Sequence, residues 1–168
     1  MLPISKAFAD TPEDLTFKSK YDIELKIIKQ NFLNIAKFSC PCRRKKMSES
    51  DWENYKSDHL SNVWKSLHMI SFLYLVNPNT KSQLLIFNLL NKELIRIPCP
   101  TCRNHYIEYK KKCKDLKEVC KTKLKFIIWL IDFHNNVNKR LEKKEFSYKE
   151  IFELYNYNFN SCILDWIQ

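Results

Sequence analysis

A long helix is predicted by residues 121–143, which read KTKLKFIIWLIDFHNNVNKRLEK. Apolar residues recur in this segment every three or four positions, which is the spacing of an amphipathic helix that buries one face. The residues expected on the buried face are Leu124, Ile127, Ile128, Ile131 and Leu141. Near its end, His134 and Asn138 are four positions apart and therefore share one side of the helix. The segment predicts both a core helix and a candidate binding surface.

The same periodicity recurs along most of the chain. Further helices are predicted over residues 21–38, 51–76, 80–95 and 148–157, with a short helix that begins at Pro98-Cys99-Pro100. Asn77-Pro78 is expected to end one of these helices, and Ser147–Glu150 forms a capping-box pattern that begins the last. No stretch shows the alternation of a strand, so the sequence predicts an all-α protein.

Five of these helices are expected to build one core domain over residues 51–158. An N-terminal arm, residues 1–50, precedes it and carries the helix over 21–38 and a Cys-Pro-Cys linker, and residues 159–168 form a tail. The expected apolar stripes are Ile23, Ile27, Ile28, Phe32, Ile35 and Phe38 in the arm, and Leu84, Phe87, Leu90 and Leu94 in the helix over 80–95. Whether the arm packs on the domain is left open by the sequence.

The composition excludes several classes of protein. The 168 residues contain no glycine, which rules out the Gly-rich loop of a Rossmann site and the Walker A phosphate loop. The net charge is +10, but 24 of the 29 basic residues are Lys and not the Arg that base reading prefers, so no nucleic-acid role is expected. No apolar run approaches the roughly 18 residues of a membrane span, and the first residues lack a signal-peptide pattern.

The seven cysteines are the most informative residues of the composition. An odd number without a secretion signal argues against a static disulfide scaffold and leaves redox chemistry or metal binding. Cys99-Pro100-Thr101-Cys102 stands at a predicted helix start, where the helix dipole favours the reactive thiolate. Arg103 and His105 follow closely, and both are expected to lower the pKa of a nearby thiol as well. This pattern favours a redox pair.

A zinc site is the alternative for the same cysteines. It would join Cys99 and Cys102 with Cys40 and Cys42, or with His105. Structural zinc prefers two knuckles whose cysteines are separated by two to four residues, whereas Cys40-Pro41-Cys42 has one residue between its cysteines. We therefore expect no metal site.

Two predicted helices carry histidines next to aromatic or amide side chains. Trp64 and His68 are four positions apart on one helix, and His134, Asn135 and Asn138 lie together on another. The ordinary interpretation is a packed Trp and His with solvated amides. Beside a reactive Cys-x-x-Cys, the same residues would form a slot for a planar ring with polar edges. The residues alone leave both interpretations open.

Three motifs in this order resemble the Erv/ALR sulfhydryl oxidases. They are WxxxH (Trp64–His68), Cys-x-x-Cys (Cys99–Cys102) and HNxVNxxLxK (His134–Lys143), and the resemblance covers roughly residues 52–157. Ile131 and Ser147 stand where many cellular members have a structural disulfide. The chain is therefore most similar to the compact oxidases of large DNA viruses.

The resemblance implies a four-helix bundle plus a short fifth helix, usually a homodimer, with FAD at its mouth. It implies cofactor contacts from Trp64, His68, Tyr74, His134, Asn135, Asn138, Lys143 and Tyr155. The implied activity is a thiol oxidase, in which protein dithiols or a thioredoxin-like carrier attack the disulfide at Cys99. Electrons then pass through Cys102 to FAD and on to oxygen, giving hydrogen peroxide, and His105 is a candidate for tuning the Cys102 thiolate. The expected location is the cytoplasm or virion, with the mitochondrial intermembrane space as alternative.

The other cysteines lie outside these motifs. Cys40 and Cys42 suit the shuttle dithiol that family members often carry on an arm. Cys113 and Cys120 either form a local disulfide or stay free thiols, and Cys162 has no assigned role. The alternative function is a zinc-stabilised basic module that binds nucleic acid, and it predicts a colourless protein where the oxidase should be yellow.

Overall fold

Helices make up all the regular secondary structure of the described residues. The structure is a computed structural model that describes residues 10–39, 47–113 and 115–155. Its α-helices are α1 (Pro12–Ser39), α3 (Glu49–Leu73), α4 (Thr80–Asn88), α5 (Pro100–Lys112), α6 (Leu116–Val119), α7 (Lys123–Arg140) and α8 (Tyr148–Leu154). A π-helical turn, Leu89–Glu93, and a 3-10 turn, Leu94–Arg96, continue α4. The predicted all-α class is confirmed.

Helix α1 begins at Pro12, nine residues before the predicted start. Thr11 caps it: its hydroxyl accepts from the Asp14 backbone N–H at 3.1 Å, and the Asp14 carboxylate accepts from the Thr11 N–H at 3.0 Å. Thr-Pro-x-Asp is a helix-start signal in its own right, because proline suits the first helical position. The predicted start at residue 21 was therefore wrong for a reason visible in the sequence.

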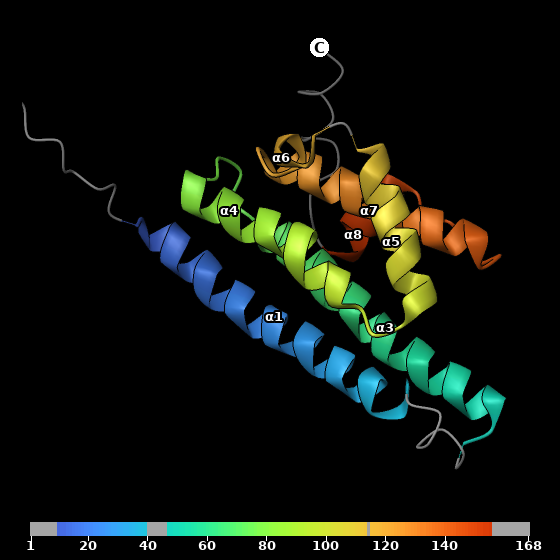
Figure 1. Cartoon of the computed structure of the whole chain (residues 1–168). Coiled ribbons are helices and arrows are strands. Elements are labelled where there is room, and N and C mark those ends of the chain that lie inside the picture. Colours follow the sequence, from blue (N-terminus) through green and yellow to red (C-terminus); the bar gives the residue numbers. More distant parts are fainter. Residues whose placement is uncertain (1–9, 40–46, 114, 156–168) are drawn as a thin grey trace, which may run out of the picture.

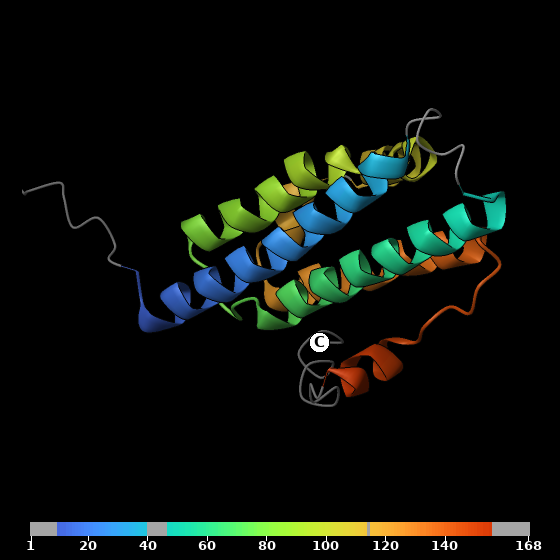
Figure 2. The same cartoon turned by 90° about the horizontal axis from the view of Figure 1, so that it is seen from below.

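Helix α1 packs along α3 and belongs to the main core. Figures 1 and 2 show the two helices antiparallel and side by side. Tyr21 donates from its hydroxyl to the Leu85 carbonyl at 3.2 Å, and His59 Nδ1 lies 2.7 Å from the Asn31 side-chain oxygen. Phe17 and Ile28 lie in the same buried cluster as core residues of α3, α4 and α7. The described part of the arm is thus packed on the domain.

Several predicted stripe residues are exposed. Ile23 is 55% exposed and Ile27 39%, while Leu84 and Leu141 are each 54% exposed. The buried side of α1 instead carries Phe17, Tyr21, Ile28, Phe32 and Ile35. Residues that a broad helical stripe includes at its edge stay in solvent when the neighbouring helix contacts only the centre of that stripe.

The last helix, α8, begins as predicted, because Ser147 and Glu150 form the complete capping box. Its Ile151 and Phe152 form a smaller buried cluster with Phe72 of α3 and with α7. Helix α8 therefore brings the end of the described chain against the α3–α7 pair. Among the described residues, no helix has the length and apolar character needed to cross a membrane.

Candidate functional site

The Cys-x-x-Cys motif opens helix α5. Cys99 is the N-cap and Pro100 occupies the first turn, as the sequence predicts. The Cys102 backbone N–H donates to the Cys99 sulfur at 3.4 Å, and the two sulfur atoms lie 2.6 Å apart. Both cysteines are free thiols in this structure. The helix start therefore holds the two sulfurs close enough together for a disulfide to form between them.

The two thiols have different proton affinities. The hydrogen bond from the Cys102 thiol lowers the pKa of Cys99 to about 6, with a smaller contribution from the Cys102 backbone N–H. The same hydrogen bond, together with burial, raises the pKa of Cys102. In the reduced pair, Cys99 is therefore the thiolate and Cys102 keeps the proton.

Two cations from other helices lie close enough to act on this pair. Lys56 of α3 lowers the pKa of both cysteines, and Arg140 at the end of α7 lowers that of Cys102. Glu53 binds the Lys56 ammonium at 2.6 Å and raises the pKa of Cys99. Sequence reasoning missed Lys56 and Arg140, because neither lies in a motif and only the packing of α3 and α7 brings them to α5.

A cluster of aromatic and imidazole rings lies between α3, α7 and α8. The rings of Trp64 and His134 are stacked with centroids 3.9 Å apart and planes 4° from parallel. His68 Nε2 lies 3.0 Å from His134 Nδ1. Tyr155 follows α8 and lies with its ring 5.9 Å from that of His68 and stacked on Phe72 at 4.7 Å. Four predicted site residues from three helices are thus together.

The histidines of this cluster are neutral. Burial, with a smaller effect of His134, lowers the pKa of His68 to about 3. Burial and the charge of Lys143 lower the pKa of His134 to about 4. In the 3.0 Å contact only one of the two facing nitrogens carries a proton. The outer nitrogen of His68, Nδ1, has no hydrogen-bond partner among the described residues.

Two buried side-chain nitrogens have no hydrogen-bond partner within the described residues, one in this cluster and one on α5. They are Nδ1 of His68 and Nδ1 of His105. Buried polar atoms nearly always have a partner, and an orphaned one points to a missing group. A ligand with a planar ring and a polar edge would satisfy this region.

A series of ring contacts connects α5, the helix that carries the dithiol, to the cluster of Trp64 and His134. Tyr106, on the same helix as Cys102, has its ring centroid 5.2 Å from that of Phe133. The Phe133 ring is in turn 5.1 Å from that of Trp64. Cys102 itself packs against the core cluster that contains Phe133. The dithiol and Trp64 of the stack therefore pack against the same core cluster.

Three other predicted cofactor contacts have different surroundings. Asn135 exchanges two hydrogen bonds with the Phe146 backbone, at 2.7 and 2.8 Å, and Asn138 donates to the Lys144 carbonyl at 3.1 Å. Both amides therefore hold the loop after α7. Tyr74 lies in the main core, where its hydroxyl donates to the Cys120 carbonyl at 2.6 Å. The structure does not bring Tyr74 to the Trp–His stack.

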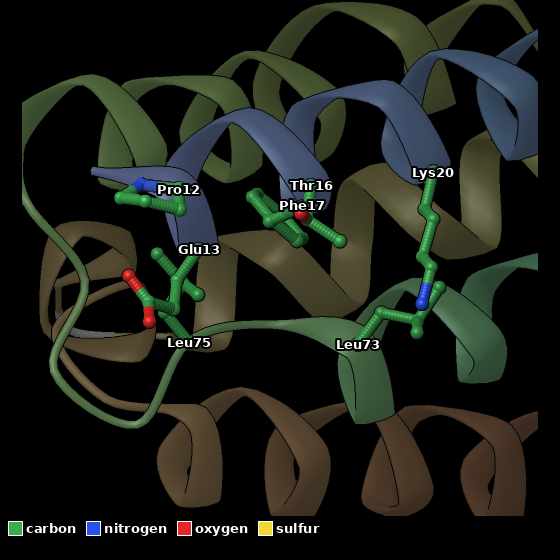
Figure 3. Close-up of a pocket in the computed structure, with 7 residues that line it drawn as sticks. All are labelled: Pro12, Glu13, Thr16, Phe17, Lys20, Leu73 and Leu75. Atoms are coloured by element: carbon green, nitrogen blue, oxygen red, sulfur yellow. The ribbon is translucent and has the colours of Figure 1, made fainter. Parts of the chain in front are cut away.

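The groove in Figure 3 is separate from this site. It has a volume of about 280 Å³ and lies between the first turns of α1 and the end of α3, lined by Phe17, Lys20 and Leu73 among others. None of the predicted site residues lines it.

The structure describes two of the five remaining cysteines. Cys40, Cys42 and Cys162 lie outside the described residues. Cys113 and Cys120 are free thiols, so the local disulfide is not formed in this structure. In the described ranges, no three His, Cys, Asp or Glu side chains gather as metal ligands would.

Comparisons with known proteins give a consistent picture. A family model described as the Erv1 / Alr family matches residues 61–156. An FAD-linked sulfhydryl oxidase of African swine fever virus (isolate Pig/Kenya/KEN-50/1950) is 32% identical over 92 residues, which is 55% of this chain and 75% of that protein.

Two further viral proteins, whose names also describe FAD-linked sulfhydryl oxidases, are similar. The protein from Acanthamoeba polyphaga mimivirus is 29% identical over 107 residues, 64% of this chain and 70% of its own length. The one from Invertebrate iridescent virus 3 is 27% identical over 97 residues, 58% of this chain and 65% of its own length. No solved structure is significantly similar to the chain.

Proposed function

The chain belongs to the Erv1/Alr family, and we propose that it is an FAD-linked thiol oxidase that forms disulfide bonds in protein substrates. One observation supports this most directly: a free dithiol at a helix start packs against the same core cluster as Trp64 of the Trp–His stack, and the buried Nδ1 of the adjoining His68 has no hydrogen-bond partner among the described residues. A flavin ring has the flat faces and polar edge that this region lacks. The viral relatives support action in the cytoplasm or virion.

Trp64, His68, His134 and Tyr155 are the residues that would hold FAD, with Lys143 near its charged part. When bound, FAD takes the electron pair of the reduced cysteines and passes it to oxygen, which yields hydrogen peroxide. Asn135 and Asn138 would act by holding the loop after α7, and Tyr74 by supporting the core. A homodimer remains a prediction from the family.

The protein's own chemistry is thiol–disulfide exchange. A substrate thiolate bonds to the Cys99 sulfur of the Cys99–Cys102 disulfide, and Cys102 leaves as a thiolate. The second substrate thiolate attacks the substrate sulfur of this mixed disulfide and releases Cys99. The substrate gains a disulfide and the pair is reduced.

The surroundings of the two sulfurs support this order. Arg140, at the end of the helix that carries His134, acts on Cys102, whereas Glu53 of α3 acts on Cys99. The link from Arg140 to the helix of His134 favours Cys102 as the sulfur on the proposed cofactor side. Because Cys99 is only 7% exposed and Cys102 is half-buried, the reverse order is the alternative, and serine variants separate the two.

His105 suits the role of proton acceptor for Cys102. In the reduced pair Cys102 keeps its proton, which must leave before the sulfur can give up its electron pair. His105 lies three residues later on the same helix, and its Nδ1 has no hydrogen-bond partner in the part of the chain that the structure describes. Burial and the charge of Arg140 lower the pKa of His105, so the ring is neutral and able to accept.

Oxygen consumption and absorbance together test the proposed function. The purified chain is expected to show a flavin spectrum in the visible range and to consume oxygen when a small dithiol is added. A colourless, zinc-containing protein that consumes no oxygen would instead support the nucleic-acid-binding alternative.

We also propose that Cys40 and Cys42 carry electrons from protein substrates to Cys99–Cys102. The ends of α1 and α3 that flank them lie at the same end of the bundle as the start of α5 (Figures 1 and 2). The five residues from Cys42 to Met47 can span at most about 17 Å. From the start of α3, Lys56 is about 10 Å further along the helix, and it acts electrostatically on Cys99.

The double change Cys40→Ser and Cys42→Ser is expected to slow oxidation of a folded protein dithiol by about tenfold or more, because the tethered relay is lost. Oxidation of a small dithiol should stay within about twofold of wild type, since such a reagent reaches the Cys99–Cys102 pair directly. Oxygen consumption on both substrates measures this, with Cys162→Ser as the matched control. Equal losses on both substrates would contradict the shuttle.

A further inference from the structure

A second pair of thiols lies at the other end of α5. Cys113 is the C-cap of α5 and Cys120 the C-cap of α6, and both are free. Cys113 follows Cys102 by eleven residues, which is about 16 Å along a helix. These two thiols therefore take no part in the exchange at Cys99–Cys102.

The two thiols face a common part of the core. Cys120 is 2% exposed and belongs to the main core cluster, and Cys113 packs against the same cluster. Both act on the buried Tyr106, whose pKa is raised by burial and then by these two cysteines. Cys113 also shares a pocket with Val119, the residue next to Cys120.

This pocket has a volume of about 360 Å³ and opens on Cys113. Its apolar wall consists of Val119, Ile128 and Trp129. Asp115 and Asp132 add carboxylates that accept hydrogen bonds from neutral donors, the Lys117 backbone N–H at 2.8 Å and the Tyr148 hydroxyl at 2.6 Å.

Because both donors are neutral, these hydrogen bonds do not neutralise the negative charges of Asp115 and Asp132. The third acid of the pocket, Glu118, is paired with Lys121 and with Lys125, the one lysine among the described residues that line the pocket. The pocket is thus acidic and partly apolar on a chain whose net charge is +10. It suits a small cationic group with an aliphatic stem.

The two thiols differ in reactivity. Burial, with the neighbouring Cys113, raises the pKa of Cys120 to about 12, and its thiol donates to the Leu116 carbonyl at 3.3 Å. Cys120 is therefore protonated and enclosed. Cys113 is half-buried and lines the open pocket, so it is the thiol that an external reagent meets first.

We propose that Cys113 is a second thiol-exchange site, which reacts with small cationic disulfides in this pocket and then closes onto Cys120. The Cys113 thiolate bonds to one sulfur of the external disulfide and releases the other half as a thiolate. Cys120, whose proton passes to the thiolate released in the first step, attacks the Cys113 sulfur and releases the second half. The protein gains one disulfide, and the external disulfide is reduced to two thiols. This inference is independent of FAD and of the proposed oxidase activity.

Cystamine and oxidised glutathione, which are cationic and anionic disulfides, are suitable probes. The full wild-type chain is incubated with each, and non-reducing peptide mapping by mass spectrometry follows the adducts. We expect Cys113 to react about tenfold or more faster with cystamine, because the acidic pocket attracts it. We also expect a peptide in which Cys113 and Cys120 are linked.

Two variants make the test decisive. Cys120→Ser should accumulate the Cys113–cysteamine adduct, since no second thiol can displace it, and Asp132→Asn should reduce the preference for cystamine. Lys18→Gln, a charge change on α1 outside the pocket, is the matched control and should leave the preference unchanged. Equal rates with both probes, an unmodified Cys113, or the absence of a linked peptide in wild type would overturn the proposal. None of these readouts depends on turnover, so they leave the oxidase proposal untouched.

Discussion

Replacing Cys102 with serine is expected to reduce dithiol-dependent oxygen consumption by at least about 1,000-fold while FAD stays bound. The change removes the disulfide on which exchange depends, whereas the Trp64–His134 stack proposed to hold the cofactor is built from other helices. Oxygen consumption and the ratio of flavin to protein absorbance measure the two effects. Cys162→Ser serves as the control and should keep wild-type activity.

The companion variant Cys99→Ser decides the order of the two sulfurs. It should lose turnover equally, but it leaves Cys102 alone beside the proposed cofactor, so a long-wavelength charge-transfer band is expected in its spectrum. If that band arises in Cys102→Ser instead, Cys99 is the sulfur next to the flavin and our assignment is reversed. Wild-type activity in either variant would contradict the mechanism.

The second large effect is expected at His134. Its ring is stacked on Trp64 and in contact with His68, so His134→Ala should open the cluster and lower the flavin-to-protein ratio at least severalfold. Added FAD should then raise the melting temperature, because a ligand at a hundredfold excess over its Kd stabilises the folded state by about 3 kcal/mol. Absorbance of the folded fraction and thermal melts with and without FAD provide the measurement.

His59→Ala is the matched control for this experiment. His59 lies on α3 and, like His134, contacts an aromatic ring, that of Tyr55 at 4.3 Å, but its Nδ1 contacts Asn31 of α1. It should lose some stability and keep its flavin. An unchanged flavin ratio in His134→Ala would return the Trp–His stack to ordinary core packing.

Local patterns in the sequence predicted most of the helices, but they missed α6 and the start of α1. Periodic apolar residues predicted all the longer helices, and the capping box at Ser147 placed the start of α8. Cys99 as N-cap followed from its position before Pro100. These features depend on residues within one or two helical turns of each other, so the sequence alone is enough to predict them.

The three motifs also predicted the family and the kind of site. The spacing Trp64–His68 and the His134 motif each place their residues on one helix face, and that part needs no tertiary structure. Their actual contact, with stacked rings 3.9 Å apart, depends on how α3 and α7 are rotated against each other.

Only the tertiary structure decided which side chains meet between helices. It packed α1 on α3, exposed Ile23, placed Tyr74 in the main core, and brought Lys56 and Arg140 to the dithiol. The physical reason is that one helix's periodicity defines an apolar face but not the neighbour that covers it. Partner, rotation and distance follow from packing the whole core at once, and with them the charges around Cys99 and Cys102.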